Sequence, residues 1–187
     1  RGWRNRTALV MDGKVGKLRQ GLVALAPPLT GIVLVLIAAT PLYIGHVGQI
    51  MPQMGVIAVF FWVIYRPDLM TYGAAFAIGL VADLVTGAPL GVSALVLLVL
   101  RRVVLAQQRF FIGKPFHVLW SGFALVALPA ALLQWLLASI YLFAGLEILP
   151  VLLQAALTTI LFPPVSWVLT RCQVLLPMPR TPLHNRG

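Results

Sequence analysis

One carboxylate stands out among the residues that could do chemistry, because it lies within an apolar stretch. Asp83 occurs in the segment GLVADLVTGAPLG, residues 79–91, where leucine, valine and alanine surround it. A lone acid in such surroundings avoids an uncompensated charge in one of three ways. It is protonated, it meets a cation from another chain, or it accepts backbone N–H groups. These alternatives correspond to a proton or ligand site, a partner contact and a structural cap.

The other reactive side chains form no recognisable catalytic or metal-binding set. The three histidines are far apart, at His46, His117 and His184, and a single cysteine, Cys172, excludes an internal disulfide framework. Neither a second acid nor a histidine is expected at the depth of Asp83. We therefore predict a protein that is not an enzyme and that uses no metal or cofactor.

Composition indicates that the solvent around this segment is a lipid bilayer. Hydrophobic residues make up 60% of the 187 residues and charged residues only 10%, whereas a soluble domain has about 25% charged residues. The net charge is +10, but the chain has no basic stripe on a soluble fold that could bind nucleic acid. We therefore expect no nucleic-acid partner. The predicted fold class is an all-α polytopic membrane protein.

The chain contains apolar runs separated by polar connections. They lie at about residues 22–44, 51–65, 69–86, 90–106, 117–144 and 147–170. The first, fifth and sixth are long enough to cross the hydrocarbon, which takes about 20 residues, whereas the others are short. All 14 Lys and Arg residues fall on alternate connections. Under the positive-inside rule, this pattern predicts six transmembrane helices with both termini in the cytoplasm.

The same pattern divides the chain into three parts. We expect a basic cytoplasmic arm over residues 1–20, a six-helix transmembrane domain over residues 21–171 and a cytoplasmic tail over residues 172–187. The arm is not expected to be a signal peptide, because no small-residue cleavage site follows the first apolar run. It either sets the topology alone or also binds the anionic surface of the bilayer.

In this topology Asp83 lies in the outer part of the third span, on a side without Lys or Arg. Backbone N–H groups at the start of the fourth helix are then the favoured partners, with Pro89 as the first helical residue. These N–H groups belong to Gly91, Val92 and Ser93. We predict that Asp83 and Thr86 tie the turn over residues 86–91 to this helix start.

Two further sets of polar residues call for an explanation. Gln134, Ser139 and Gln154 are expected at a depth similar to that of Asp83. They form either one cluster with Asp83 or separate helix–helix hydrogen bonds. The inner connection expected over residues 101–117 lies at the lipid interface as an amphipathic segment or receives a cytoplasmic filament protein. Its basic and aromatic residues are Arg101, Arg102, Arg109, Phe110, Phe111 and Lys114.

Several stretches resemble the MreD family of rod shape-determining proteins. In that family a short second span ends in Arg-Pro, and the next span carries a Gly…Asp…Gly-x-Pro-Leu-Gly pattern. The corresponding residues in FWVIYRPDLM (61–70) and GLVADLVTGAPLG (79–91) are Arg66, Pro67, Gly79, Asp83, Gly87, Pro89, Leu90 and Gly91, with Asp68 in the same stretch. The segment QQRFFIGKPFHVLW (107–120) also resembles the family's connection into the fifth span.

The resemblance implies a scaffold subunit of the bacterial cell-elongation machinery for peptidoglycan synthesis, spanning the inner (cytoplasmic) membrane several times. It implies an MreC-like bitopic membrane protein as partner. The MreB filament, RodA and a class B penicillin-binding protein are implied as further neighbours. The family is similar in fold to the substrate-binding subunits of energy-coupling-factor vitamin transporters. The alternative function is accordingly that of a small-solute binding subunit of a membrane transporter.

Overall fold

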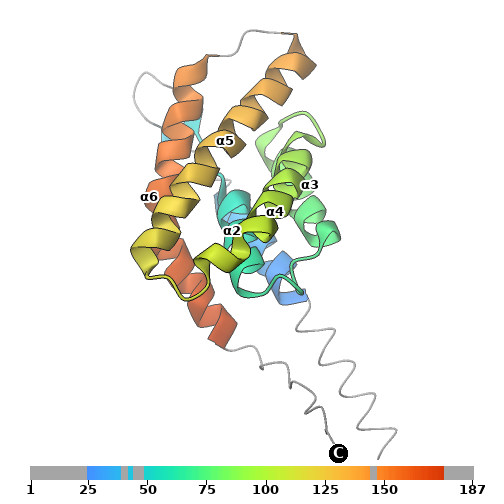
Figure 1. Cartoon of the computed structure of the whole chain (residues 1–187). Helices are drawn as coiled ribbons and strands as arrows, with labels where there is room; N and C mark the ends of the chain where they lie inside the picture. The colour runs from blue at the N-terminus through green and yellow to red at the C-terminus, as the bar shows by residue number, and fades with distance from the viewer. Residues whose placement is uncertain (1–24, 39–41, 44–48, 144–146, 175–187) are drawn as a thin grey trace, which may run out of the picture.

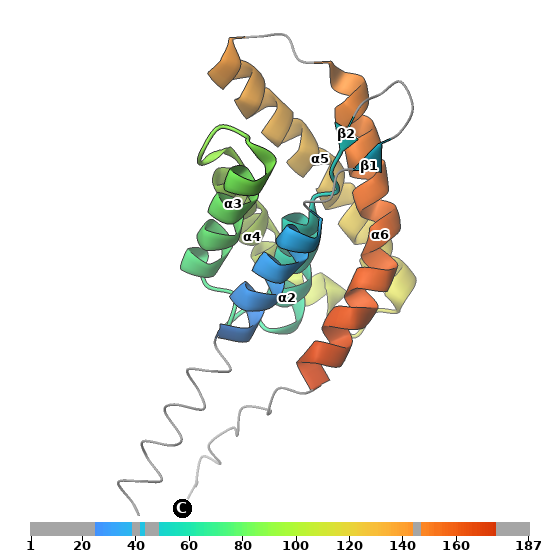
Figure 2. The ribbon, with the colours of Figure 1, turned by 180° about the vertical axis from the view of Figure 1, so that it is seen from behind.

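Helices make up almost all of the computed structural model, which describes residues 25–38, 42–43, 49–143 and 147–174 (Figure 1). The N-terminal helix is described over Leu25–Ile37. Five further helices follow along the described part of the chain, and Figure 2 shows them from behind. They are α2 (Met54–Tyr65), α3 (Tyr72–Thr86), α4 (Val92–Phe111), α5 (Phe116–Leu142) and α6 (Ile148–Val174). The predicted all-α class is confirmed, whereas the basic arm over residues 1–20 and the tail beyond Val174 lie outside the described residues.

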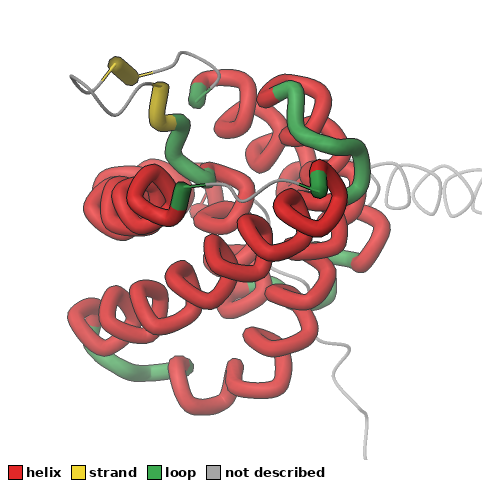
Figure 3. The backbone as a smooth tube through the Cα atoms, turned by 90° about the horizontal axis from the view of Figure 1, so that it is seen from above, coloured by secondary structure: helices red, strands yellow, loops and turns green. Residues whose placement is uncertain are grey.

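The first apolar run, residues 22–44, is not one continuous helix. The N-terminal helix stops at Ile37, and β1 (Leu42–Tyr43) pairs antiparallel with β2 (Gln49–Ile50). Figure 3 shows this strand pair at one edge of the helices. Apolarity alone does not separate a short strand from the end of a helix, so the sequence pattern overestimated the helix length.

Helix α2 lies at the centre of the bundle and packs against α3, α4, α5 and α6. All of residues 55–64 are buried, as expected for a helix that is apolar on every side. Phe60 makes edge-on contacts with the rings of Phe111, Phe123 and Phe162, at centroid distances of 5.9, 5.1 and 5.7 Å. These aromatic contacts join α2 to the three helices that follow α3.

The helices differ in their fitness to cross a bilayer. Among the described residues, two helices, α5 and α6, are long and apolar enough to do so, while the N-terminal helix, α2 and α3 are shorter apolar helices. Large apolar side chains on α5 and α6 are exposed, including Leu125 at 75% and Ile160 at 65%. Such surfaces fit a lipid environment, which agrees with a membrane protein. The arrangement with six crossings stays a prediction.

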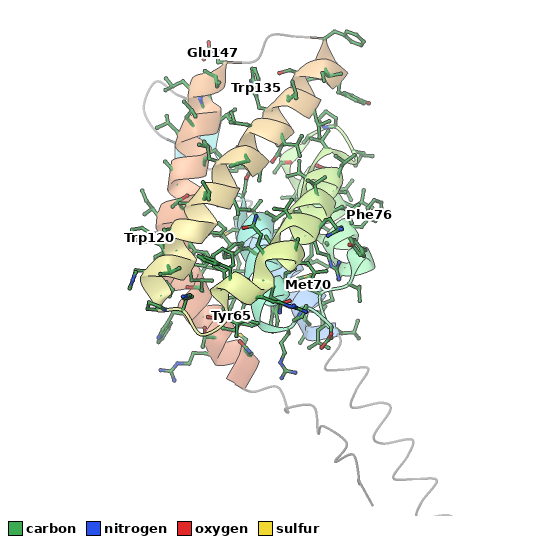
Figure 4. All side chains as sticks on the ribbon, in the orientation of Figure 1. Tyr65, Met70, Phe76, Trp120, Trp135 and Glu147 are labelled. Atoms are coloured by element: carbon green, nitrogen blue, oxygen red, sulfur yellow. The ribbon has the colours of Figure 1, made fainter. Side chains whose placement is uncertain are left out.

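The two ends of the bundle carry different charges. The start of the N-terminal helix, the end of α6 and the connections α2–α3 and α4–α5 share one end, here called the inner end (Figures 1 and 2). Tyr65 lies near it, and Glu147 lies at the opposite, outer end (Figure 4). The described basic residues lie on the connections of the inner end, on α4 or in the last turn of α6. They are Arg66, Arg101, Arg102, Arg109, Lys114 and Arg171.

The inner connection predicted over residues 101–117 is wrong, because α4 continues to Phe111 and only residues 112–115 lead to α5. Arg101 is a helical residue with only 8% of its surface exposed. Its Nε donates to the Met70 carbonyl at 2.6 Å, and its guanidinium lies 3.8 Å from the ring centroid of Tyr72. These contacts compensate for part of the burial of the charge inside a helical bundle.

Candidate functional site

The segment around Asp83 folds into a tight hairpin of α3 and α4. The Thr71 side chain caps the start of α3 by accepting a hydrogen bond from the Ala74 N–H at 3.2 Å. Gly87 at φ +67° ends α3, and Gly91 at φ +97° precedes α4. Both conformations are in the left-handed region, which is open to glycine without steric penalty. The two glycines of the sequence pattern are therefore explained by backbone geometry.

Asp83 caps the start of α4 from the neighbouring helix, as predicted. Its carboxylate is fully buried and accepts hydrogen bonds from the Gly91 N–H at 2.7 Å and the Ser93 N–H at 2.9 Å. Gly91 has no side chain that could cap the helix itself. The positive end of the α4 dipole thus faces the Asp83 carboxylate, so both a buried charge and free N–H groups are satisfied.

Two details of the predicted hairpin are wrong. Thr86 does not reach the turn: its hydroxyl donates to the Ala82 carbonyl at 2.8 Å, within α3. A threonine hydroxyl inside a helix commonly binds the backbone carbonyl four residues earlier, and it is then not available to the turn. Pro89 is not the first residue of α4, which begins at Val92, and the Val92 N–H donates to the Pro89 carbonyl at 3.3 Å. Leu90 lies exposed in the same turn, at 64%.

Gly79 sets the distance between α3 and α4. A Cβ atom at this position would lie 2.2 Å from Ala94 Cα and 2.5 Å from Ala94 N, both backbone atoms. No side-chain movement relieves such an overlap. Small residues allow helices to approach this closely, and the close approach brings Asp83 within reach of the α4 start.

A chain of hydrogen bonds leads from Asp83 into the rest of the bundle. The Ser93 N–H binds Asp83, and the Ser93 hydroxyl accepts a bond of 3.3 Å from Gln134 Nε2 on α5. Gln134 Oε1 in turn accepts a hydrogen bond from Gln53 Nε2. The network therefore joins α3, α4 and α5 to the residue that precedes α2.

The network continues to α6 through Gln53. The Gln53 N–H donates to the Thr158 hydroxyl at 3.0 Å, and this hydroxyl donates to the Gln154 carbonyl at 2.6 Å. Gln154 Nε2 donates to the Met51 carbonyl at 2.8 Å. Of the two arrangements considered from the sequence, the structure thus has a single cluster containing Asp83, Gln134 and Gln154. Ser139 does not join it, and its buried hydroxyl has no hydrogen-bond partner among the described residues.

Sequence reasoning missed Gln53, Thr158 and the hydroxyl of Ser93, of which only the N–H was predicted as a donor. Gln53 directly precedes the apolar run of α2, and Thr158 is fully buried in α6. A polar residue within an apolar run is the available signal, because a buried hydroxyl or amide requires a partner. The pairings themselves join positions 81 and 105 residues apart, and a single sequence does not reveal them.

A small cavity lies beside the network. Its volume is about 50 Å³, and its polar walls include Gln53, Ser93, Gln134 and Gln154. This space suits a few water molecules. Within the described part of the chain, no group of three His, Cys, Asp or Glu side chains is arranged to hold a metal ion. The chemistry available here is hydrogen bonding between helices.

The remaining candidate residues lie toward the inner end. The Arg66 N–H donates to the Trp62 carbonyl at 2.7 Å as α2 ends, and Pro67 and the exposed Asp68 form the following turn. A proline here ends the helix because it lacks an N–H and restricts the residue before it. Of the basic and aromatic residues predicted for the inner connection, four have exposed side chains, whereas Phe111 belongs to the buried hydrophobic core. The exposed ones are Arg102, Arg109, Phe110 and Lys114.

Replacing Thr158 with valine is expected to destabilise the protein by about 1–3 kcal/mol, because the partly buried Gln53 N–H loses its acceptor. Thr159 provides the control, since its hydroxyl only donates to the Ala155 carbonyl within α6. Thermal unfolding in detergent measures both effects. A Thr159→Val variant as unstable as Thr158→Val would contradict a role of the network in joining the helices.

The comparison with protein families supports the resemblance that the sequence motifs indicated. A family model described as rod shape-determining protein MreD matches residues 19–172, which include the α3–α4 hairpin and the end of α2. The comparison with curated proteins gives no match, and the comparison with solved structures gives none. MreD is a membrane-associated family that acts in rod shape determination, and it is not a known enzyme family. Because the match covers most of the chain, the protein belongs to the MreD family of rod shape-determining proteins.

Proposed function

We propose that the protein is a multi-pass scaffold of the bacterial inner membrane that binds an MreC-like bitopic partner within the cell-elongation machinery. One observation carries this proposal: most polar groups in the apolar part of the bundle bind other groups of the protein, the described exceptions there being Gln53 Oε1 and the Ser139 hydroxyl. Asp83 is occupied by two N–H groups, and Gln134 and Gln154 bind other residues of the network. A site for proton transfer or solute binding requires polar groups that are free to exchange partners.

The outer tip of the α3–α4 hairpin is the surface we assign to this partner. Leu84 and Leu90 are exposed there at 68% and 64%, on a backbone held by the Asp83 cap. The connection over residues 87–91 is too short to form a periplasmic domain, so an output on that side requires another protein. The exposed basic residues Arg102, Arg109 and Lys114 are the corresponding surface for the MreB filament, and further helix faces remain for RodA and a class B penicillin-binding protein.

The size of the small cavity disfavours solute binding at the polar network, where the alternative of a small-solute binding subunit would place its ligand. Pockets that bind small molecules are typically about 300–1,000 Å³, whereas the cavity beside Gln53 and Gln134 has about 50 Å³. The similarity to energy-coupling-factor subunits stays a prediction about the fold. A vitamin that raises the melting temperature of the purified protein would support the transporter function, and no shift across a vitamin and ion panel is expected.

Cysteine labelling in a Cys172→Ser background tests the orientation on which the scaffold depends. With membrane-impermeant maleimide, Leu90→Cys is expected to react in intact spheroplasts and Lys114→Cys only after lysis. Lys114→Cys that reacts before lysis would overturn the proposed topology. A photoreactive residue at position 84 or 90 is then expected to crosslink to a bitopic MreC-like chain in native membranes. The absence of a protein crosslink from both positions would contradict the assigned surface.

A further inference from the structure

A second, larger cavity opens between the inner ends of α2, α4 and α5. Its volume is about 480 Å³, which is within the range of pockets that bind small molecules. Residues from the ends of all three helices and from the α4–α5 connection line it. They are Ile64, Tyr65, Gln108, Phe111, Ile112, Gly113, Lys114, Phe116 and Leu119. The small cavity near the outer end shares none of these residues.

The walls of this inner cavity are mainly apolar and well supported. Ile64, Phe111 and Leu119 are buried, at 4%, 7% and 5% exposure. Phe111 contacts Phe60 of the aromatic core, at a centroid distance of 5.9 Å. The amide of Gln108 is already engaged, because its Nε2 donates to the Ile64 carbonyl at 3.0 Å. The cavity therefore has apolar walls packed against the core, and one of its lining residues is charged.

That charged group is Lys114. The preceding Gly113 adopts φ +77°, which turns the chain after α4, and the Lys114 N–H donates to the Phe111 carbonyl at 3.2 Å. Lys114 Nζ lies 5.8 Å from the centroid of the Phe110 ring, and the Lys114 side chain is exposed. Lys114 lines the cavity, and because its side chain is exposed, its ammonium group remains available to an anion.

The cavity carries no compensating negative charge. None of its lining residues is acidic. The carboxylate of Asp83 is bound at the start of α4, and Glu147 lies at the outer end. Asp68 lies in the α2–α3 connection and does not line the cavity. The combination of an apolar wall and one cation fits an amphipathic anion.

We propose that this inner cavity binds one anionic phospholipid. Its acyl chain would pack against Ile64, Phe111 and Leu119, and its phosphate would contact the Lys114 ammonium. Basic pockets between helices at the cytoplasmic surface are suited to anionic headgroups, and exposed lysines extend toward such headgroups while their stems cover apolar surface. This inference rests on the proposed orientation of the inner end in the cytoplasm, but it does not depend on the partner.

Native mass spectrometry of the purified protein with defined lipids tests the inference. Wild type is expected to bind one phosphatidylglycerol in preference to phosphatidylcholine. Lys114→Gln should weaken this first binding event about fivefold, the change expected when one lysine near an anionic headgroup is lost. Arg109→Gln is the matched control, because Arg109 is an exposed cation of the same α4 end but does not line the cavity. Its affinity should change less than twofold.

Three outcomes would overturn the inference. They are equal retention of phosphatidylcholine, equal losses in both variants, and competition of millimolar inorganic phosphate with the lipid in wild type. The last outcome would assign the site to a free phosphate instead. Co-purification of the MreC-like partner is measured separately, with wild type and with the Lys114→Gln variant. If lipid binding fails while the partner is retained, only this inference is wrong, and if both fail in wild type, the proposed function is wrong as well.

Discussion

Asp83→Ala is expected to destabilise the protein by about 3 kcal/mol or more and to abolish co-purification of the partner. The variant leaves two N–H groups, the partly buried one of Gly91 and the buried one of Ser93, without an acceptor. A hydrogen bond to a charged group contributes about 1.5–3 kcal/mol, and the interaction of the carboxylate with the α4 dipole is lost as well. Thermal unfolding in detergent and partner co-purification measure the two effects.

Asp83→Asn separates the charge from the hydrogen bond. The amide keeps one acceptor oxygen, so we expect a loss of stability between that of wild type and that of Asp83→Ala. Asp68→Ala is the control, because Asp68 is exposed and its carboxylate makes no hydrogen bond with the described residues. Normal stability and normal complex formation in both Asp83 variants would show that the cap has no importance for the fold or for the partner.

Gly79→Ala is expected to separate α3 from α4 and to cost about 3 kcal/mol, the upper part of the range for overpacked cores. The added Cβ would lie 2.2 Å from Ala94 Cα, and only a shift of a whole helix removes this overlap. Such a shift also moves Asp83 away from Gly91 and Ser93. Unfolding measurements should therefore show a loss comparable to that of Asp83→Ala.

Gly73→Ala is the matched control in the same helix. A Cβ at position 73 would meet only the Thr71 hydroxyl oxygen, at 3.9 Å. Alanine favours a helix over glycine by up to about 1 kcal/mol, so this variant is expected to be neutral or slightly more stable. In the Gly79→Ala/Asp83→Ala double variant, the losses should add incompletely, because both changes disrupt the same contact between helices. Full additivity would indicate that the two residues act independently.

The sequence determined the features of this protein that depend on neighbouring residues and on overall composition. Its apolar composition predicts an all-α membrane protein. The acceptor in Asp83 and the donors in Gly91 and Ser93 are only 8 and 10 residues apart. A helix that turns back within five residues brings such groups together, so the cap followed from spacing and from the need of a buried carboxylate for donors.

The tertiary structure decided which distant groups meet. The Arg101–Arg102 pair indicated the end of a span, yet Arg101 lies in the middle of α4. The Met70 carbonyl and the Tyr72 ring, which approach from the α2–α3 side, compensate for part of the burial of its charge there. Gln134 forms a side-chain hydrogen bond with Gln53, 81 positions away, whereas the Ser139 hydroxyl has no hydrogen-bond partner among the described residues. A sequence states that a buried polar group needs a partner, but only the packing of helices far apart along the chain decides which partner comes within hydrogen-bonding distance.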